Sequence, residues 1–269
     1  MIINTNVLSL NAHRNMGLNT TRLGKASEKL SSGLRVNRAA DDAAGLAVSE
    51  TMRSQIRGLN QANRNVQDGI SYAQTAEGAL DEVSAMLIRA KELLVQAATG
   101  TYTEGDRANI QEELTALGSE MINIITSTKF NELAITAGAS IATGHDGSLE
   151  ILIPPVDETE VDNIRTNIDI SGDTDGSTAK GFVSLIEHAI EDISTQRAEI
   201  GAVQNRLEHT LQNQKVTVEN VTASESRIRD TDMASEMMSF TKFNVLNQAA
   251  QSMMAQANQI PNQALGLLQ

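Results

Sequence analysis

The sequence predicts a mainly α-helical protein: an elongated antiparallel helical rod or coiled coil with a short β-hairpin and paired terminal helices. Three observations predict this fold class. Two of them are heptad stripes of apolar residues, one over residues 46–98 and one over residues 178–221. The third is a composition with four Phe, two Tyr and no Trp among 269 residues. Because aromatic side chains supply much of the buried area in globular cores, this composition favours helix-on-helix seams of Ala, Leu, Ile, Val and Met.

The first stripe predicts one continuous central helix. Such a helix would be roughly 80 Å long at 1.5 Å per residue, whereas a compact globule of this chain length would be about 50 Å across. We therefore expect an elongated molecule. The stripe repeats every seven residues at Met52, Leu59, Val66, Ala73, Leu80, Leu87 and Leu94.

Two further helices are predicted to share the seam of the central helix. The segment 99–102 interrupts the stripe, and Thr103 with Asp106 predicts the cap of a returning helix. Ser177 and Thr178 are candidate caps of the last rod helix. That helix carries Phe182, Ile186, Ala189, Ile193, Ile200, Val203 and Leu207.

Residues 131–178 differ in character, being rich in Gly, Asp, Thr and Pro. Leu149, Ile151 and Ile153 alternate with other residues before Pro154 and Pro155. This pattern predicts a short β-hairpin with loops.

The two ends of the chain predict matched amphipathic helices, the first stopping at Gly33 and the second carrying a potential kink at Pro261. Residues 243–269 contain no charged side chain, and an isolated helix of that kind is poorly stabilised. We expect neighbouring subunits to cover it, the alternative being a disordered tail rich in Gln and Asn. The apolar positions are Leu8, Ala12, Met16, Leu23, Ala26 and Leu30, and Phe243, Leu246, Ala250, Met253, Ala257, Ile260, Ala264 and Leu267.

Composition excludes several classes of protein. The formal charge of −13 argues against a nucleic-acid partner, which needs clustered Lys and Arg. The absence of Cys removes disulfides and thiolate sites. Residues 1–15 show no cleavable secretory signal, and no run of eighteen apolar residues predicts membrane insertion.

No catalytic, cofactor or metal site is predicted. Glu187, His188, Glu191 and Asp192 crowd one helical turn, but a solvated acidic face explains them better than a metal site. Neither a His-Glu-x-x-His helix nor a phosphate-binding glycine loop is present. We therefore expect a protein that is not an enzyme and takes no cofactor.

Four segments carry a family resemblance. They are SSGLRVNRAADDAAGLAVSE at 31–50, AVQNRLEH at 202–209, ESRIRD at 225–230 and QANQ at 256–259. Together the chain resembles the bacterial flagellins over residues 1–133 and 179–269. The interval 131–178 is too short for the outer domains of larger members, so the resemblance implies a short form.

The resemblance implies a domain organisation. Residues 1–33 and 232–269 would form an inner terminal coiled coil, with residues 34–45 and 222–231 as spoke linkers. Residues 46–130 and 179–221 would form the helical rod, and residues 131–178 would replace the outer domains.

The resemblance also implies a function. The chain would be secreted by the flagellar type III apparatus and would polymerise into the helical filament used for swimming. Its implied partners are other copies, an export chaperone holding residues 232–269, flagellar cap and junction proteins, and host Toll-like receptor 5. Arg89, Leu93 and Glu113 match the receptor-binding positions of the family.

We expect the terminal stripes and the spokes to carry self-assembly, with Asp41 pairing with Arg229. Two alternatives remain open, a hook–filament junction protein and a monomeric coiled-coil binding module. Open-ended polymerisation separates both from a filament subunit. The assembly candidates are Leu23, Leu30, Arg35, Asn37, Asp41, Asp42, Arg227, Arg229, Asp230, Phe243, Leu246, Met253, Ile260 and Leu267.

Overall fold

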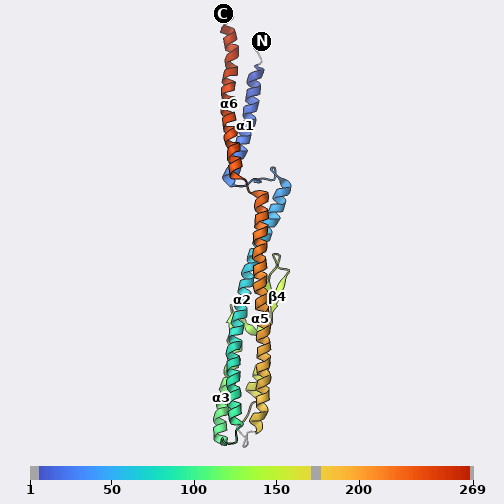
Figure 1. Cartoon of the computed structure of the whole chain (residues 1–269), viewed down its shortest axis with the longest axis vertical. Coiled ribbons are helices and arrows are strands. Elements are labelled where there is room, and N and C mark those ends of the chain that lie inside the picture. Colours follow the sequence, from blue (N-terminus) through green and yellow to red (C-terminus); the bar gives the residue numbers. More distant parts are fainter. Residues whose placement is uncertain (1–5, 171–176, 267–269) are drawn as a thin grey trace. The chain divides into compact units, whose positions relative to one another are not determined.

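The computed structural model describes residues 6–170 and 177–266, and of residues 261–266 only the backbone (Figure 1). The predicted mainly α fold class is confirmed. The helices are α1 (Val7–Ser32), α2 (Ala43–Ala97), α3 (Glu104–Ser127), α4 (Thr159–Asn167), α5 (Ser177–Arg229) and α6 (Met233–Gly266). The remaining elements are β1 (Lys129–Phe130), β2 (Leu133–Ala134), the 3₁₀ turn η1 (Ile135–Ala137), β3 (Ala139–Ala142) and β4 (Glu150–Ile153).

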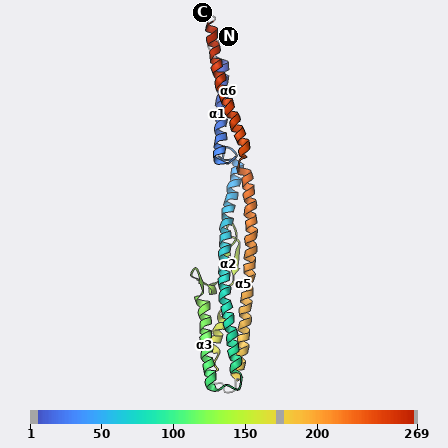
Figure 2. The ribbon, with the colours of Figure 1, turned by 60° about the vertical axis from the view of Figure 1, so that its left-hand side comes forward.

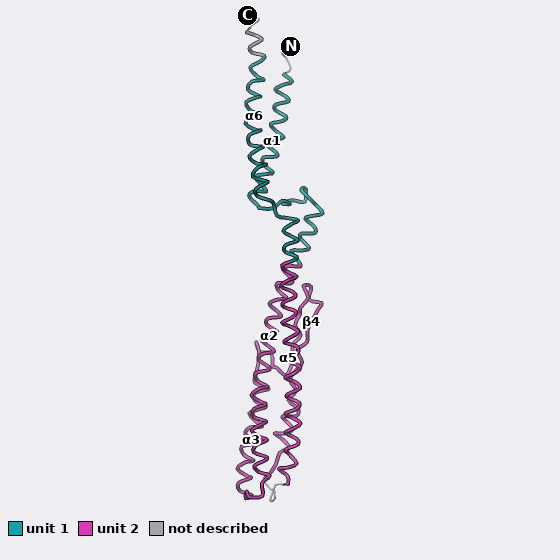
Figure 3. The backbone as a smooth tube through the Cα atoms, viewed as in Figure 1, with its two compact units in different colours: residues 1–54, 220–269 teal, residues 55–219 magenta. Residues whose placement is uncertain are grey.

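The chain divides into two compact units, which are coloured separately in Figure 3. Unit 1 contains residues 1–54 and 220–269, and unit 2 contains residues 55–219. Both divisions fall inside long helices, α2 and α5. Residues 222–229, expected as a linker, are helical and continue α5.

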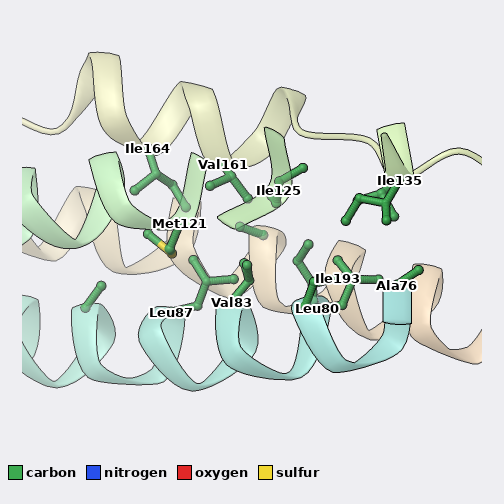
Figure 4. Close-up of a cluster of buried hydrophobic side chains, with 14 of the residues drawn as sticks. Ala76, Leu80, Val83, Leu87, Met121, Ile125, Ile135, Val161, Ile164 and Ile193 are labelled. Atoms are coloured by element: carbon green, nitrogen blue, oxygen red, sulfur yellow. The ribbon is translucent and has the colours of Figure 1, made fainter. Parts of the chain in front are cut away.

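Unit 2 has its own apolar core between α2, α3 and α5, which lie side by side (Figure 2). The predicted stripe of α2 is buried from Val66 onward, and that of α5 is buried at four positions spaced by seven residues. Figure 4 shows Leu80, Val83 and Leu87 of α2 meeting Met121 of α3 and Ile193 of α5. The buried α5 positions are Ile186, Ile193, Ile200 and Leu207.

The turn between α2 and α3 follows the predicted cap. The Thr103 hydroxyl accepts a hydrogen bond from the Asp106 backbone N–H at 3.4 Å, and the Thr103 N–H donates to the Asp106 carboxylate at 3.0 Å. This reciprocal pair is a capping box, which satisfies donors at the start of α3. Arg107, one residue further on, is buried at 1% exposure.

The segment predicted as one hairpin with loops contains more structure. Strands β1 and β2 form one antiparallel hairpin, and β3 and β4 form a second, with Ile141 opposite Ile151. The prediction missed α4, whose Val161 and Ile164 are buried against α3. A nine-residue helix presents too few turns for its periodicity to be recognised.

In unit 1, α1 and α6 lie side by side (Figure 1). Helix α1 ends as predicted at Gly33, whose φ of 71° is the left-handed conformation that glycine adopts without strain. Helix α6 continues through position 261 to Gly266, so the proline does not end it. These two helices, α1 and α6, form the terminal helix pair.

Candidate assembly surface

Side-chain contacts join the two helices of the terminal helix pair near both of its ends. The Asn6 side chain donates to the Ala257 carbonyl at 2.6 Å, and the Ser9 hydroxyl donates to the Asn258 side chain at 2.8 Å. Toward the other end, the guanidinium of Arg22 lies 5.9 Å from the Phe243 ring centroid, a cation–π geometry. An apolar seam accompanies these contacts, because Met16, Leu23 and Leu30 of α1 and Phe240, Phe243 and Met254 of α6 are half-buried.

Most apolar side chains of the terminal helix pair face solvent. Among its described residues only Ala26 of α1 and Ala257 of α6 are buried, although the two helices span 26 and 34 residues. Apolar surface on this scale marks an interaction site. The side chains exposed by 40–69% are Val7, Leu8, Leu10, Leu18, Met233, Met237, Met238, Val245, Leu246, Met253 and Ile260.

The predicted assembly residues on these helices divide into two groups. Leu23, Leu30 and Phe243 are half-buried. Leu246, Met253 and Ile260 point outward with 40%, 58% and 46% of their surface exposed. Leu267 lies outside the described residues.

The exposed face of α6 includes a shallow apolar groove of about 540 Å³. Its lining is mostly apolar, and Thr241 and Lys242 are the polar residues among those that line it. Such a groove accommodates apolar side chains of another helix. The remaining lining residues are Met237, Met238, Val245 and Leu246.

The segments after α1 and at the end of α5 pair through their backbones. Leu34 and Asp230 form an isolated antiparallel bridge, and the Arg35 N–H donates to the Arg229 carbonyl at 2.6 Å. On the other side, the Thr231 N–H donates to the Gly33 carbonyl at 3.0 Å. The guanidinium of Arg35 also donates to the Ile228 carbonyl. The structure thus brings together Arg35, Arg229 and Asp230, chiefly through main-chain groups.

Arg229 does not pair with Asp41 as expected, because its guanidinium is bound to Glu50 of α2 at 2.6 Å. The Arg229 side chain is 10% exposed, so this ion pair is mostly desolvated on the arginine side. A second ion pair joins Arg53 to Glu225 at 2.9 Å. Sequence reasoning missed Glu50, Arg53 and Glu225, because a helix pattern alone cannot show which charges from distant segments meet.

Asp41 and Asp42 instead organise their own turn. Asp41 accepts the Arg38 N–H at 3.1 Å, and this bond, with a smaller contribution from nearby lysines, lowers the pKa of the Asp41 carboxyl. Asp42 accepts the Gly45 N–H at 2.9 Å at the start of α2. Asn37 donates to Glu28 of α1 at 2.8 Å. These residues fix the path of the chain from α1 to α2.

The remaining predicted residues of this region make local contacts on α5. The exposed Arg227 donates to the Ser224 hydroxyl at 3.0 Å. Asp230 accepts from the Ser226 hydroxyl at 2.7 Å. Both are therefore held by neighbours one helical turn away.

The candidate receptor residues lie in unit 2. Arg89 of α2 donates to Glu113 of α3 at 3.0 and 3.1 Å and also contacts Glu92. The hydrogen bond to Glu113, followed by that to Glu92, raises the pKa of the Arg89 guanidinium. Leu93, by contrast, is only 2% exposed and belongs to the core, so it offers no contact surface.

The acidic turn on α5 has a structural explanation in part. Glu187 forms an ion pair with Lys91 of α2 at 2.9 Å. The hydrogen bond and the charge of Lys91 lower the pKa of the Glu187 carboxyl. His188, Glu191 and Asp192 line a shallow surface depression with Glu160. In the described part of the chain no three His, Asp or Glu side chains are grouped as metal ligands would be.

Comparisons with known proteins match both terminal regions of the chain. A family model described as the bacterial flagellin N-terminal helical region matches residues 3–140, and the C-terminal helical region matches residues 183–268. The chain belongs to the bacterial flagellin family. It is similar to flagellins of Halalkalibacterium halodurans, with 48% identity, and of Bacillus subtilis, with 45% identity, each match covering 100% of both chains.

A solved relative supports the fold. The crystal structure of Bacillus cereus flagellin matches with a TM-score of 0.50 and 27% identity, covering 56% of this chain and 88% of that one. This flagellin is therefore a structural subunit of the extracellular flagellar filament and not an enzyme. None of its described helices has the length and apolarity needed to cross a membrane.

Proposed function

We propose that the terminal helix pair is the surface through which this flagellin polymerises. The observation that carries the proposal is the contrast between the two units: unit 2 encloses a core, whereas α1 and α6 leave Leu8, Leu246 and Met253 facing solvent. Complete burial of a fully exposed Leu or Met side chain gains about 1.5–3 kcal/mol, and these partly exposed side chains would gain roughly half of that against another copy. Residues 1–33 and 232–269 would then form the inner layer of the filament and residues 46–130 and 179–221 the surrounding rod, joined by the spokes 34–45 and 222–231.

The contact must be heterologous, one surface meeting a different surface of the next copy. Repetition of such a contact that does not close on itself generates a helix of indefinite length rather than a ring. The groove lined by Met237 and Leu246 is one half of such a contact. An apolar stripe of a neighbouring terminal helix would be the other half.

Electron microscopy of salt-polymerised protein tests the proposal. Long hollow filaments are expected from the full chain, and discrete particles from a chain lacking residues 243–269 and from the variant Leu246→Asp. The matched control is Thr195→Asp, which adds the same charge at an exposed position of α5 in unit 2. Filaments from the truncated chain would overturn the proposal.

The same experiment addresses the two alternatives. A hook–filament junction protein would form short, limited assemblies, and a monomeric coiled-coil module would form none. Sedimentation of the full chain over a range of concentrations distinguishes these outcomes, because only open-ended polymerisation shows a critical concentration.

The exposed apolar face of α6 also supports binding of a flagellin export chaperone before assembly. Residues 232–269 would be held in the cytoplasm until type III export, after which cap and junction proteins would meet the filament ends. Calorimetric titration of a purified export chaperone is expected to give binding to the full chain and none to a chain lacking residues 232–269. Equal binding by both chains would exclude this role for α6.

We further propose that Arg89 and Glu113 form a contact surface for host Toll-like receptor 5. Arg89 and Glu113 keep 50% and 46% of their side chains exposed, and their ion pair joins α2 to α3 into one continuous surface. Leu93 would act only by packing beneath that surface.

A receptor reporter assay tests the surface. Arg89→Ala and Glu113→Ala are each expected to reduce signalling, whereas Glu120→Ala, at an exposed position of the same helix α3, serves as the matched control. Unchanged signalling by both variants would remove Arg89 and Glu113 from the contact surface.

A further inference from the structure

The exposed sulfur of this flagellin is concentrated on one helix. The chain has ten methionines and no cysteine, so all of its sulfur atoms belong to methionine thioethers. Among the described methionines, the exposed ones all lie on α6. Their exposed fractions are 47% for Met233, 51% for Met237, 69% for Met238 and 58% for Met253. Met121 of α3, by contrast, is completely buried in unit 2. Access of a small oxidant should follow the same division.

These methionines occupy the surface that assembly would use. Met237 and Met238 line the groove of about 540 Å³ on α6 together with Val245 and Leu246. The thioether is apolar and flexible, which suits it to packing against another helix. Its sulfur keeps a lone pair that reacts when solvent reaches it.

We propose that Met233, Met237, Met238 and Met253 form a reversible oxidation site through which peroxide blocks assembly of the free subunit. A sulfur lone pair attacks one oxygen of hydrogen peroxide, and the O–O bond breaks as the S–O bond forms. The other oxygen leaves as hydroxide, takes the proton from the OH group now bonded to sulfur, and so becomes water. Sulfur loses two electrons and the peroxide gains them, which gives methionine sulfoxide.

The consequence for polymerisation rests on the proposed function of α6. A sulfoxide oxygen is a strong hydrogen-bond acceptor, and burying it in an apolar interface without a donor is unfavourable. One such oxygen per subunit is expected to raise the critical concentration for polymerisation by about tenfold or more. Because sulfoxide is reducible by methionine sulfoxide reductases, the block is reversible.

Peroxide treatment of free subunits and of preformed filaments, followed by peptide mass spectrometry, tests the site. In free subunits the four α6 methionines should oxidise first, with buried Met121 as the internal control. In filaments the same four should be protected. Uniform oxidation of Met121 and the α6 methionines in the free subunit would overturn the inference, whereas unprotected α6 methionines in filaments would overturn the proposed function.

Two variants separate oxidation from loss of packing. Met→Leu at all four positions keeps the apolar surface, so this variant should polymerise with and without peroxide. Met237→Gln with Met238→Gln, which introduces amide oxygens of comparable polarity, should raise the critical concentration without peroxide. Recovery of assembly by oxidised wild-type chain after methionine sulfoxide reductase treatment is the expected result. An unchanged critical concentration of oxidised wild-type chain, with normal assembly before treatment, would overturn the inference while leaving the proposed function intact.

Discussion

Arg107 is almost completely buried in unit 2, although its side chain is charged. Its guanidinium donates to the carbonyl of Ala97, the last residue of α2, at 3.0 Å and to that of Thr99 at 3.2 Å. The last carbonyls of a helix have no partner within the helix, and a cation near them also interacts favourably with the helix dipole. Arg107 therefore joins the end of α2 to the start of α3.

Replacement of Arg107 by Met should be costly. The substitution keeps much of the volume but leaves carbonyls without donors, so we expect a loss of about 2–3 kcal/mol in the free energy of unfolding. Urea unfolding of the depolymerised chain measures it. The control is Arg206→Met, since Arg206 is exposed on α5 and its loss should change stability little. Equal stability of the two variants would show that Arg107 does not cap α2.

The ion pair between Glu50 and Arg229 makes a second prediction for individual residues. Glu50→Arg is expected to destabilise the depolymerised chain by about 1–3 kcal/mol, because Arg229 is only 10% exposed and would face a like charge. Adding Arg229→Glu should recover part of that loss. A loss in the double variant equal to the sum of the losses of Glu50→Arg and Arg229→Glu, each measured alone, would indicate no coupling between the residues. Salt-induced assembly of the three variants should follow the same order.

At the scale of elements, short polar caps decide where the helices begin. Asp106 accepts hydrogen bonds from the Thr103 hydroxyl and, to a smaller extent, from the Thr103 backbone N–H, and these bonds lower the pKa of its carboxyl. A carboxyl with a lowered pKa in the folded chain stabilises the fold above its unfolded pKa and loses this effect as the pH falls. The cap of α3 should therefore weaken in acid.

The cap is tested by Asp106→Asn. At pH 7 the variant should be less stable than the wild type, because the amide of Asn replaces the charged acceptor of the capping box. The difference should shrink as the pH falls below about 4, where the wild-type carboxyl becomes protonated. Urea unfolding at pH 7 and pH 3 measures the change. A difference independent of pH would show that the charge of Asp106 does not contribute.

The elements also show the limits of sequence prediction. The bounds of α2 were predicted to within a few residues, because many turns repeat one period, whereas α5 runs eight residues beyond its predicted end at 221. Helix α4 was missed, because it spans nine residues and its buried Val161 and Ile164 gain their partners from α3. Leu149 was expected to share a face with Ile151 and Ile153, yet it precedes β4 and is 61% exposed.

At the scale of the whole molecule, the chain contains two units with different degrees of self-sufficiency. Unit 2 buries the seam residues of α2, α3 and α5 within one chain. The terminal helix pair leaves most of its apolar residues to solvent, and helices that bury only a narrow stripe are marginally stable. Local stability in the free subunit should therefore be unequal.

Hydrogen exchange measures that inequality directly. In the free subunit, backbone amides of α2 around Val83 and Leu87 should exchange far more slowly than those of α1 and α6. In the polymer, α1 and α6 should become protected while the core of unit 2 changes little. Equal protection of α6 in both states would argue against its burial on assembly.

The sequence by itself determined the fold class, the long helices, the capped turn at Thr103 and the family, because periodicity and short motifs are local properties. It also indicated the uncharged segment 243–269, since composition alone shows a helix that water solvates poorly. Only the tertiary structure decided that Arg229 binds Glu50, that Leu93 is buried and that Arg107 caps α2. Those facts depend on which segments meet in the folded chain. Contacts between residues that lie 10 to 179 positions apart produce no periodic pattern in the sequence.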